Sequence, residues 1–130
     1  MGALLVRNGA VLLGKRAPTR QLAPDVWDVF GGHVEPGETA EAALARELRE
    51  ELGIYAKQVN LLEVLDDPQL PDGAFPLFVV DEWVGVPFNN SPEEHTEIRW
   101  FSLDQIERLP LAHPAYVSLI ARVWGNKQVG

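Results

Sequence analysis

Residues 32–54 read GHVEPGETAEAALARELREELGI, and three carboxylates crowd together near the end of this stretch: Glu47, Glu50 and Glu51. The chain as a whole already carries a formal net charge of -8. Like charges four residues apart on a helix repel each other and cost on the order of 0.3 kcal/mol. The crowding therefore has two interpretations, either a solvated helix face or a set of carboxylates that binds a cation.

The pattern over residues 39–52 predicts an amphipathic helix. Thr39 is an N-cap residue type, and Gly53 stands where a left-handed C′ residue would end the helix. Glu47 and Glu51, at i and i+4, lie beside the apolar stripe rather than opposite it. The stripe itself comprises Leu44, Leu48 and Leu52. The carboxylates therefore border the buried face of the predicted helix.

The segments around this helix are strand-like. Asn8 and Gly9 split two short apolar runs, which predicts a β-hairpin over residues 3–16, because both central residues of its turn need positive φ. Residues 17–25 contain two prolines and little periodicity, so we expect a surface loop there. Further strands are expected over residues 26–30, 59–65, 77–86 and 98–101.

Two more helices are expected near the end of the chain. Ser102 and Gln105 have the spacing of a capping box, which begins a short helix. Pro114 suits the first position of a closing amphipathic helix over residues 115–124. Apart from the short helix, the element order is β-β-β-α-β-β-β-α. Such an order predicts an α/β fold with a mixed sheet and helices on its faces.

Composition limits the class of protein. The 130 residues are enough for one domain with a real core, and the absence of cysteine excludes disulfides and thiolate chemistry. No apolar run is long enough to span a bilayer, and the start does not read as a signal peptide, so we expect a cytoplasmic protein without membrane contact. A pI near 4.8 argues against a broad nucleic-acid surface.

The residues in front of the helix favour cation binding over a solvated face. Gly31 and Gly32 directly follow a predicted strand, where glycine lets the backbone approach a ligand and offer carbonyl oxygens to a metal. Residues 35–38 (EPGE) then form a tight turn. Mg²⁺ prefers carboxylate oxygens and keeps several waters, so two or three acids on one rigid face can bind it. Such a metal would let an acidic protein accept a polyphosphate.

The opening stretch resembles the signature of the Nudix hydrolase superfamily, which is G-x5-E-x7-R-E-U-x-E-E-x-G-U with U a bulky aliphatic residue. Gly32 and Glu38 stand at its first two fixed positions, and residues 46–54 (RELREELGI) fill the others. WDVFGG resembles the W-x-x-P-G-G approach of the family, with Phe30 in place of the usual proline, and WFSLD resembles a segment near its C-terminus. The resemblance implies the Nudix fold, an α/β/α sandwich around a mixed β-sheet, as a single domain over residues 1–130.

The resemblance also implies an activity. Members of the superfamily use Mg²⁺ or Mn²⁺ to hydrolyse a nucleoside diphosphate linked to a group X into NMP and P-X. A nucleoside triphosphate, oxidised or not, is the favoured substrate here, and ADP-ribose or another nucleotide sugar is the alternative. A catalytically silent module that binds a nucleotide and regulates a partner is a further alternative, although such a module would be expected to lose glutamates of the signature. A homodimer is common in the family.

The resemblance also implies roles for individual residues, which are assigned by their positions in the signature. The metal ligands implied are Glu47, Glu50 and Glu51, one of which could also act as base, together with the carbonyl of Gly32. Arg46 is expected to orient a glutamate rather than to touch phosphate. The resemblance also assigns a role to Glu38, through water or through loop structure.

A further acid often comes from a loop outside the signature. Among Glu93, Glu94 and Glu97 we favour Glu94, six residues before Trp100, as a metal ligand or base.

The sequence indicates a functional role less strongly for several other residues. His33 could contact phosphate and His95 could be catalytic, whereas His113 is expected at a helix start. Core packing is the better expectation for the aromatic residues Trp27, Phe78 and Trp83. One of the hairpin cations could meet a phosphate, although exposure to solvent is the default for all three: Arg7, Lys15 and Arg16.

Overall fold

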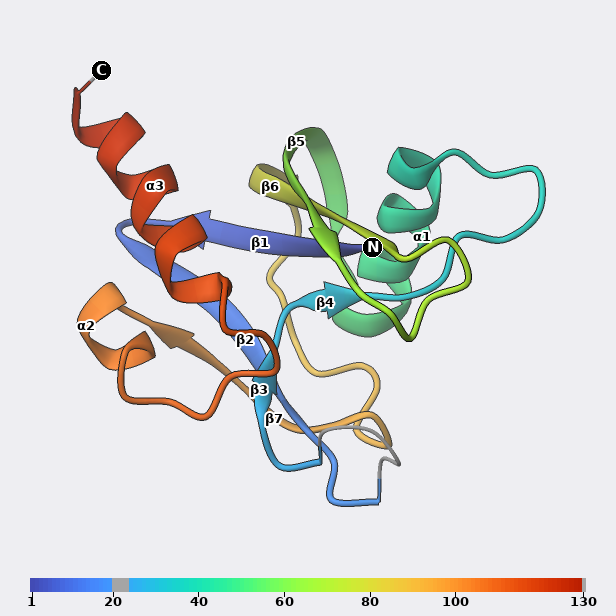
Figure 1. The fold of residues 1–130 in the computed structure, drawn as a ribbon, viewed down its shortest axis with the longest axis horizontal. Coiled ribbons are helices and arrows are strands. Elements are labelled where there is room, and N and C mark those ends of the chain that lie inside the picture. Colours follow the sequence, from blue (N-terminus) through green and yellow to red (C-terminus); the bar gives the residue numbers. More distant parts are fainter. Residues whose placement is uncertain (20–23, 130) are drawn as a thin grey trace.

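The computed structural model of the chain describes residues 1–19 and 24–129, so the loop expected over residues 17–25 lies partly outside the described residues. A mixed sheet runs in the order β3-β2-β1-β6-β5, with β4 paired to β1 and β7 paired to β2 (Figure 1). Strands β1 and β6 are parallel, and the other pairs are antiparallel. The strands are β1 (Gly2–Arg7), β2 (Ala10–Arg16), β3 (Trp27–Asp28), β4 (Phe30–Gly31), β5 (Tyr55–Asp66), β6 (Ala74–Val84) and β7 (His95–Phe101).

Helices cover both faces of this sheet. Successive residues of β1 point to opposite sides, so Ala3 and Leu5 pack with helix α1 (Ala40–Leu52), while Leu4 and Val6 pack on the other side. The second side is covered by α2 (Leu103–Ile106) and α3 (Tyr116–Val129). This arrangement confirms the predicted α/β/α sandwich. Among the described residues no helix is long and apolar enough to cross a membrane.

The predictions made from turn and cap chemistry for the hairpin and for helix α1 are confirmed, as is the capping box of Ser102 and Gln105 at the start of α2. Asn8 and Gly9 have φ of 54° and 74° at the tip of the β1–β2 hairpin. Helix α1 begins at an N-cap Thr39 that accepts a hydrogen bond from the Ala42 N–H. It ends at Gly53, which has φ 67°. The register of α1, and with it the direction of its carboxylates, is therefore set by the residues at its two ends.

The predicted strand over residues 26–30 is wrong as a single element. Trp27 and Asp28 pair with β2, whereas Phe30 and Gly31 pair with β1. The chain changes partner strands at Val29, whose N–H donates to the Asp28 carboxylate at 2.8 Å instead of joining a ladder. This crossing carries the glycine pair from the edge of the sheet to the start of β1.

Several boundaries also differ from the expectations. Strand β5 begins at Tyr55, two residues after the helix cap and four residues early, and β6 and β7 each begin three residues early. Pro114 is not the first residue of the closing helix, which begins two residues later. The reason is a turn held by His113, whose Nδ1 accepts from the Ala115 N–H at 3.0 Å and whose carbonyl accepts from the Tyr116 N–H at 3.3 Å.

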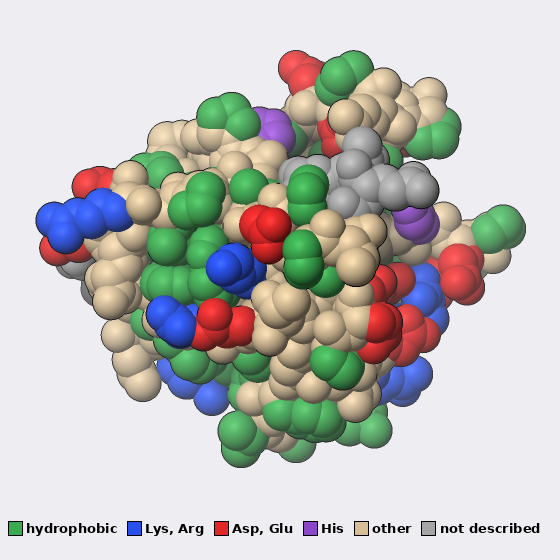
Figure 2. All heavy atoms as spheres, turned by 90° about the horizontal axis from the view of Figure 1, so that it is seen from below, with side chains coloured by type: hydrophobic (Ala, Val, Ile, Leu, Met, Phe, Trp, Pro, Cys, Tyr) green, Lys and Arg blue, Asp and Glu red, His purple; other side chains and the backbone are tan. Residues whose placement is uncertain are grey.

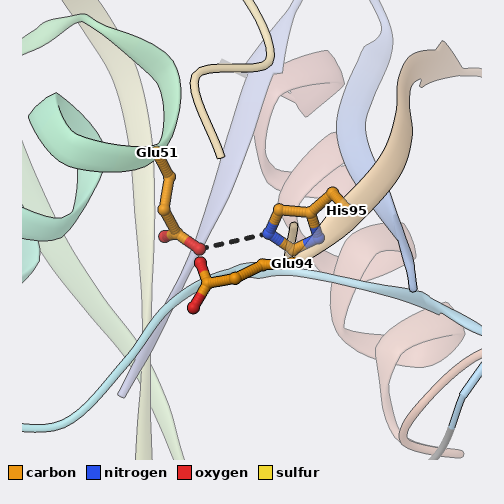
Figure 3. A group of neighbouring side chains, drawn as sticks. All are labelled: Glu51, Glu94 and His95. Carbon is orange, nitrogen blue, oxygen red and sulfur yellow. Dashed lines mark hydrogen bonds and ion pairs between the residues drawn. The ribbon is translucent and has the colours of Figure 1, made fainter. Parts of the chain in front are cut away.

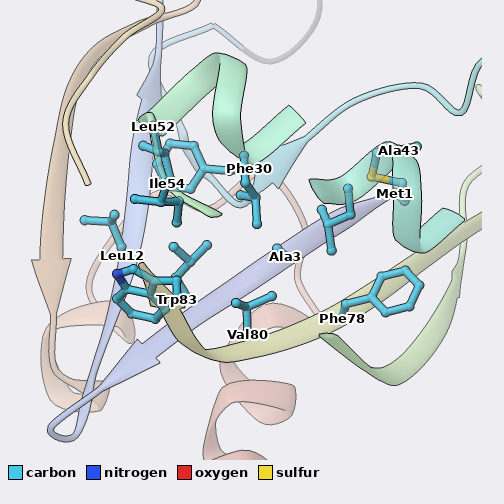
Figure 4. Packing of buried hydrophobic residues seen from close by; sticks show 13 residues of the cluster. Met1, Ala3, Leu12, Phe30, Ala43, Leu52, Ile54, Phe78, Val80 and Trp83 are labelled. Atoms are coloured by element: carbon cyan, nitrogen blue, oxygen red, sulfur yellow. The ribbon is translucent and has the colours of Figure 1, made fainter. Parts of the chain in front are cut away.

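The core beneath α1 positions the candidate site. Leu44, Leu48 and Leu52 are fully buried, as the apolar stripe predicted. They pack against residues of β1, β4 and β6 (Figure 4). Trp27, Phe78 and Trp83 are also buried, which confirms core packing for these aromatics. Because the last two turns of α1 are fixed by this core, the carboxylates beside the stripe lie at set places against β4 and β7.

Candidate active site

The glycine pair makes room for two neighbours. A Cβ on Gly31 would lie 2.1 Å from the carbonyl oxygen of Met1, and a Cβ on Gly32 would lie 2.6 Å from Oε1 of Glu47. Glycine at position 31 is therefore required by the close approach of the β1 backbone, and glycine at position 32 leaves space for the Glu47 carboxylate. Gly32 also exchanges hydrogen bonds with Met1, its N–H donating at 3.1 Å and its carbonyl accepting at 3.0 Å.

Arg46 ties three carboxylates together. Its Nε and Nη2 donate to the two oxygens of Glu38 at 2.9 and 3.0 Å, and Nη1 donates to Glu47 at 3.1 Å and to Glu50 at 3.3 Å. Nη2 also donates to the carbonyl of His33 at 3.1 Å. The hydrogen bond to Glu38 raises the pKa of Arg46, and the same contact lowers the pKa of Glu38. Arg46 thus contacts the glutamates that the resemblance expects it to orient.

Glu51 differs from the other carboxylates because it is buried, with 4% of its surface exposed. Its Oε2 accepts from the Gly31 N–H at 2.9 Å, and its Oε1 lies 3.1 Å from Nε2 of His95. Burial raises the pKa of Glu51 to about 7, against the opposing effect of the hydrogen bond to His95. Burial likewise raises the pKa of Glu47, which Arg46 opposes. The site therefore holds two carboxylates in an environment that disfavours their charge.

Among the three loop acids, Glu94 lies against the signature. Oxygen atoms of Glu51 and Glu94 and a ring nitrogen of His95 all lie within 4.8 Å of one another (Figure 3). Glu51 comes from α1, His95 begins β7 and Glu94 directly precedes it, and Glu94 and His95 point toward the Glu51 carboxylate. Glu93 is exposed, and Glu97 pairs with Arg99. The geometry thus agrees with the preference for Glu94.

A hollow opens beside these carboxylates. A cavity of about 160 Å³ is lined by residues that include Gly32, Glu51 and Glu94. A second hollow of about 470 Å³ adjoins it and shares Met1, Gly32, His33 and Leu70 with the first. Acidic side chains gather, with basic ones among them, along one edge of the face shown in Figure 2. The carboxylate cluster is therefore open to a ligand larger than an ion.

The sequence did not predict the contacts of Asp28, which lines this cavity together with Arg16 and Val29. Asp28 Oδ1 accepts from the Tyr116 hydroxyl and from the Val29 N–H, both at 2.8 Å, and Oδ2 lies 3.2 Å from Nη1 of Arg16. Burial raises the pKa of Tyr116. Tyr116 and Asp28 lie 88 residues apart in the chain, so no local pattern signals their contact.

The remaining candidates lie elsewhere or have other contacts. His33 is exposed but lines both hollows, and His113 caps the turn before α3. Lys15 lies in β2, opposite Trp27. The guanidinium of Arg7 stacks on Trp83 at 3.7 Å, at the end of β1 away from the glycine pair, so it is not near the cluster. Arg16 is the hairpin cation that lines the smaller cavity.

Comparison with known proteins agrees with this geometry. A family model described as the NUDIX domain matches residues 1–123. The chain belongs to the NUDIX domain family. The solved MutT NUDIX hydrolase of Burkholderia pseudomallei is 35% identical, with a TM-score of 0.79 over 91% of this chain and 92% of that one. The NUDIX fold of the chain is therefore shown both by its sequence and by its structure.

Curated relatives of this NUDIX chain are named as hydrolases. The NAD-capped RNA hydrolase NudC of Stutzerimonas stutzeri is 36% identical over 107 residues, which cover 82% of this chain but 37% of the relative. The 8-oxo-dGTP diphosphatase of Haemophilus influenzae is 34% identical over 108 residues, covering 80% of this chain and 78% of the relative. The nucleoside triphosphatase NudI of Enterobacter sp. is 54% identical over 50 residues, which is 36% of its length. The chain thus spans little more than a third of two of these relatives.

The donor set of this NUDIX site fits a hard divalent cation. Carboxylate oxygens of Glu47, Glu51 and Glu94 and the carbonyl of Gly32 are the ligand type that Mg²⁺ and Mn²⁺ prefer. The negative charges of Glu47 and Glu94 raise the pKa of Glu51 further. A bound cation would offset this repulsion among the three carboxylates. The crowding of acid is thus compatible with a stable fold when a cation is bound.

Glu51→Gln is expected to stabilise the metal-free protein more as pH rises. The folded-state pKa of Glu51 is raised from 4.5 to about 7, so the proton on Glu51 contributes stability below about pH 4.5 that is lost as pH rises through about 7. The full loss of folding stability is on the order of 3 kcal/mol. Glutamine does not ionise, so the variant does not lose this stability. In EDTA, the Tm of Glu51→Gln minus that of the wild type should grow between pH 5 and pH 8. A difference that stays constant over this range would contradict the assignment.

Proposed function

We propose that this chain is a divalent-cation-dependent pyrophosphohydrolase that cleaves a nucleoside diphosphate linked to X into NMP and P-X. The observation that carries the proposal is that Glu51 and Glu94 lie together at the wall of an open hollow that Gly32 also lines, with the Glu47 carboxylate packed against Gly32. An anionic substrate would be repelled from such a wall without a cation, because the protein itself carries -8. The names of its relatives as hydrolases support the same class of reaction.

The residues take the following roles in the proposal. The carbonyl of Gly32 and the carboxylates of Glu47, Glu50, Glu51 and Glu94 hold Mg²⁺, for which Mn²⁺ can substitute. Arg46 keeps the carboxylates of Glu38, Glu47 and Glu50 in place without touching the substrate. When bound, the metal supplies charge neutralisation for the phosphates and a lower pKa for the attacking water.

The bond changes are those of a hydrolysis. The oxygen of a water molecule forms a bond to phosphorus, and the bond from that phosphorus to the bridging oxygen breaks. One proton of the water leaves to a carboxylate or to solvent, and the leaving phosphate takes the bridging oxygen. For a nucleoside triphosphate the products are NMP and pyrophosphate. The raised pKa of Glu51, about 7, makes this carboxylate able to accept a proton near neutral pH.

A nucleoside triphosphate is the favoured substrate, and a nucleotide sugar is the alternative. The match to the 8-oxo-dGTP diphosphatase covers 78% of that relative, whereas the match to the NAD-capped RNA hydrolase covers 37%. The acidic composition also argues against a long RNA as the main substrate. The smaller cavity and the adjoining hollow together offer room for phosphates on one side and a nucleoside on the other.

Direct release of pyrophosphate from a nucleoside triphosphate is the expected result with purified protein and Mg²⁺. A nucleotide sugar would instead give products that release phosphate only after a phosphatase is added, so one colorimetric assay separates the two substrates. EDTA should remove turnover, and Mn²⁺ should restore it. Nucleotide binding without any hydrolysis in Mg²⁺ would instead support a silent binding module and overturn the proposal.

A further inference from the structure

His95 is enclosed at the start of β7. Its side chain is buried, and its ring meets the ring of Phe30 edge-on at a centroid distance of 5.1 Å. On β2, a Cβ at Gly14 would lie 2.7 Å from Nδ1 of His95. A residue with a side chain at position 14 would therefore displace the imidazole. The His95 ring therefore packs closely between Gly14 of β2 and Phe30 of β4.

The backbone of His95 is also fixed, by two hydrogen bonds. Its N–H donates to the Ser91 carbonyl at 3.1 Å, and its carbonyl accepts from Nδ2 of Asn89 at 2.8 Å. Residues 89–91 are in turn tied to α1, since Asn90 Nδ2 donates to the Glu50 carbonyl at 3.0 Å and the Asn90 N–H donates to the Glu51 carbonyl at 2.9 Å. The loop before β7 is thus fastened to the helix turn that carries the carboxylates.

The ring has one polar partner among the described residues. Nε2 lies 3.1 Å from Glu51 Oε1, and Nδ1 is buried without a hydrogen-bond partner. An ionised carboxylate only accepts hydrogen bonds, so with Glu51 ionised Nε2 is the nitrogen that donates to it. The second oxygen of Glu51 accepts from the Gly31 N–H at 2.9 Å. Two donors, one from β7 and one from β4, therefore hold the two oxygens of this carboxylate.

We propose that His95 is a positioning residue, which through Nε2–H holds the Glu51 carboxylate in the orientation that faces Glu94 (Figure 3). The inference rests on the proposed function, because it assumes that Glu51 binds the cation. An oriented carboxylate binds a cation without losing side-chain freedom at that moment, so affinity is higher than for a mobile one. Removal of such a supporting contact typically costs about tenfold to a hundredfold in metal affinity.

The matched pair His95→Gln and His95→Asn tests this role. Glutamine places its amide nitrogen near the position of Nε2 and can still donate to Glu51, whereas asparagine is one bond shorter and ends near Nδ1. Both variants carry the same polar group, so the cost of burying it is similar. His113→Gln, in the turn before α3, is the control for loss of a histidine away from the site. The Tm of each variant in EDTA reports whether it folds.

The first readout is the Kd for Mn²⁺ alone, measured by counting free ion with electron paramagnetic resonance. His95→Gln should bind within about threefold of the wild type, and His95→Asn should bind about tenfold or more weakly. The second readout is kinetic. At saturating metal, kcat of His95→Asn should fall by about tenfold while KM for the nucleotide stays within about threefold, because His95 does not touch the substrate.

Several outcomes would overturn the proposal. Mn²⁺ affinities within about threefold of the wild type for both the Gln and the Asn variant would mean that the donor position does not matter. A loss of at least tenfold in both would point to His95 as a direct metal ligand instead. A wild-type protein that binds no Mn²⁺ at millimolar concentration would exclude the role as well. A failure of the proposed function alone would give another result. The wild type and His95→Gln would then still bind Mn²⁺ more tightly than His95→Asn, but no nucleotide would be hydrolysed.

Discussion

Glu51→Gln is expected to lower kcat by about a thousandfold, which corresponds to about 4 kcal/mol of activation free energy. The amide keeps the shape of the carboxylate, so its oxygen can still accept from the Gly31 N–H, and its NH₂ can donate to His95 once the ring changes tautomer. What is lost is one negative charge beside Glu94, at the place proposed for the cation. Steady-state kinetics at saturating Mg²⁺, with the Tm in EDTA as a check of folding, would measure this.

Glu41→Gln is the matched control for that variant. Glu41 lies in the first turn of the same helix and is exposed, so its loss removes an equal charge at a distance from the site. Turnover of Glu41→Gln should remain close to that of the wild type. Near-wild-type turnover of Glu51→Gln would show that Glu51 is not part of the metal site.

Arg46→Met is expected to have the second largest effect, with kcat lower by about a hundredfold. Methionine keeps the apolar stem but none of the donors that hold Glu38, Glu47 and Glu50. Without the guanidinium these carboxylates repel one another, so the Tm in EDTA should fall, and Mg²⁺ should restore part of the loss. Thermal melts with and without Mg²⁺, together with steady-state kinetics, would measure both effects.

Two further variants separate charge from geometry at this position. Arg46→Lys keeps the positive charge, but an ammonium cannot hold Glu38 through two parallel hydrogen bonds, so we expect it to restore activity only in part. Arg49→Met, one turn later on the same helix and exposed, should leave turnover unchanged. Full activity of Arg46→Lys would mean that charge alone explains the role of Arg46, and full activity of Arg46→Met would remove that role altogether.

The parts of the site that were predicted correctly depend on contacts within a few residues. The Thr39 cap, the Gly53 ending and the buried stripe of α1 follow from hydrogen bonds and periodicity inside one helix. They place Glu47 and Glu51 beside the buried face before any tertiary contact is known. The ion pair between Arg46 and Glu50 was not predicted, but it is equally local, because residues four apart lie side by side on a helix.

Two features were missed because they depend on contacts between segments distant in the chain. The predicted strand over residues 26–30 ignored the crossing at Val29, since alternation of residue types does not say which strand each residue pairs with. The hydrogen bond from Tyr116 to Asp28 was not expected for the same reason. Neither feature has a local signal, because each depends on how β3, β4 and α3 pack together.

The sequence by itself determined the family, the helix that carries the carboxylates and the glycine pair in front of it, because each follows from spacing within some twenty residues of chain. Only the tertiary structure decided how these carboxylates differ. Glu51 is buried against β4 and β7 and contacts His95, 44 residues away, while Glu50 stays exposed beside Arg46. The physical reason is that burial and hydrogen-bond partners come from segments brought together by the sheet, so identical residue types acquire different charge properties.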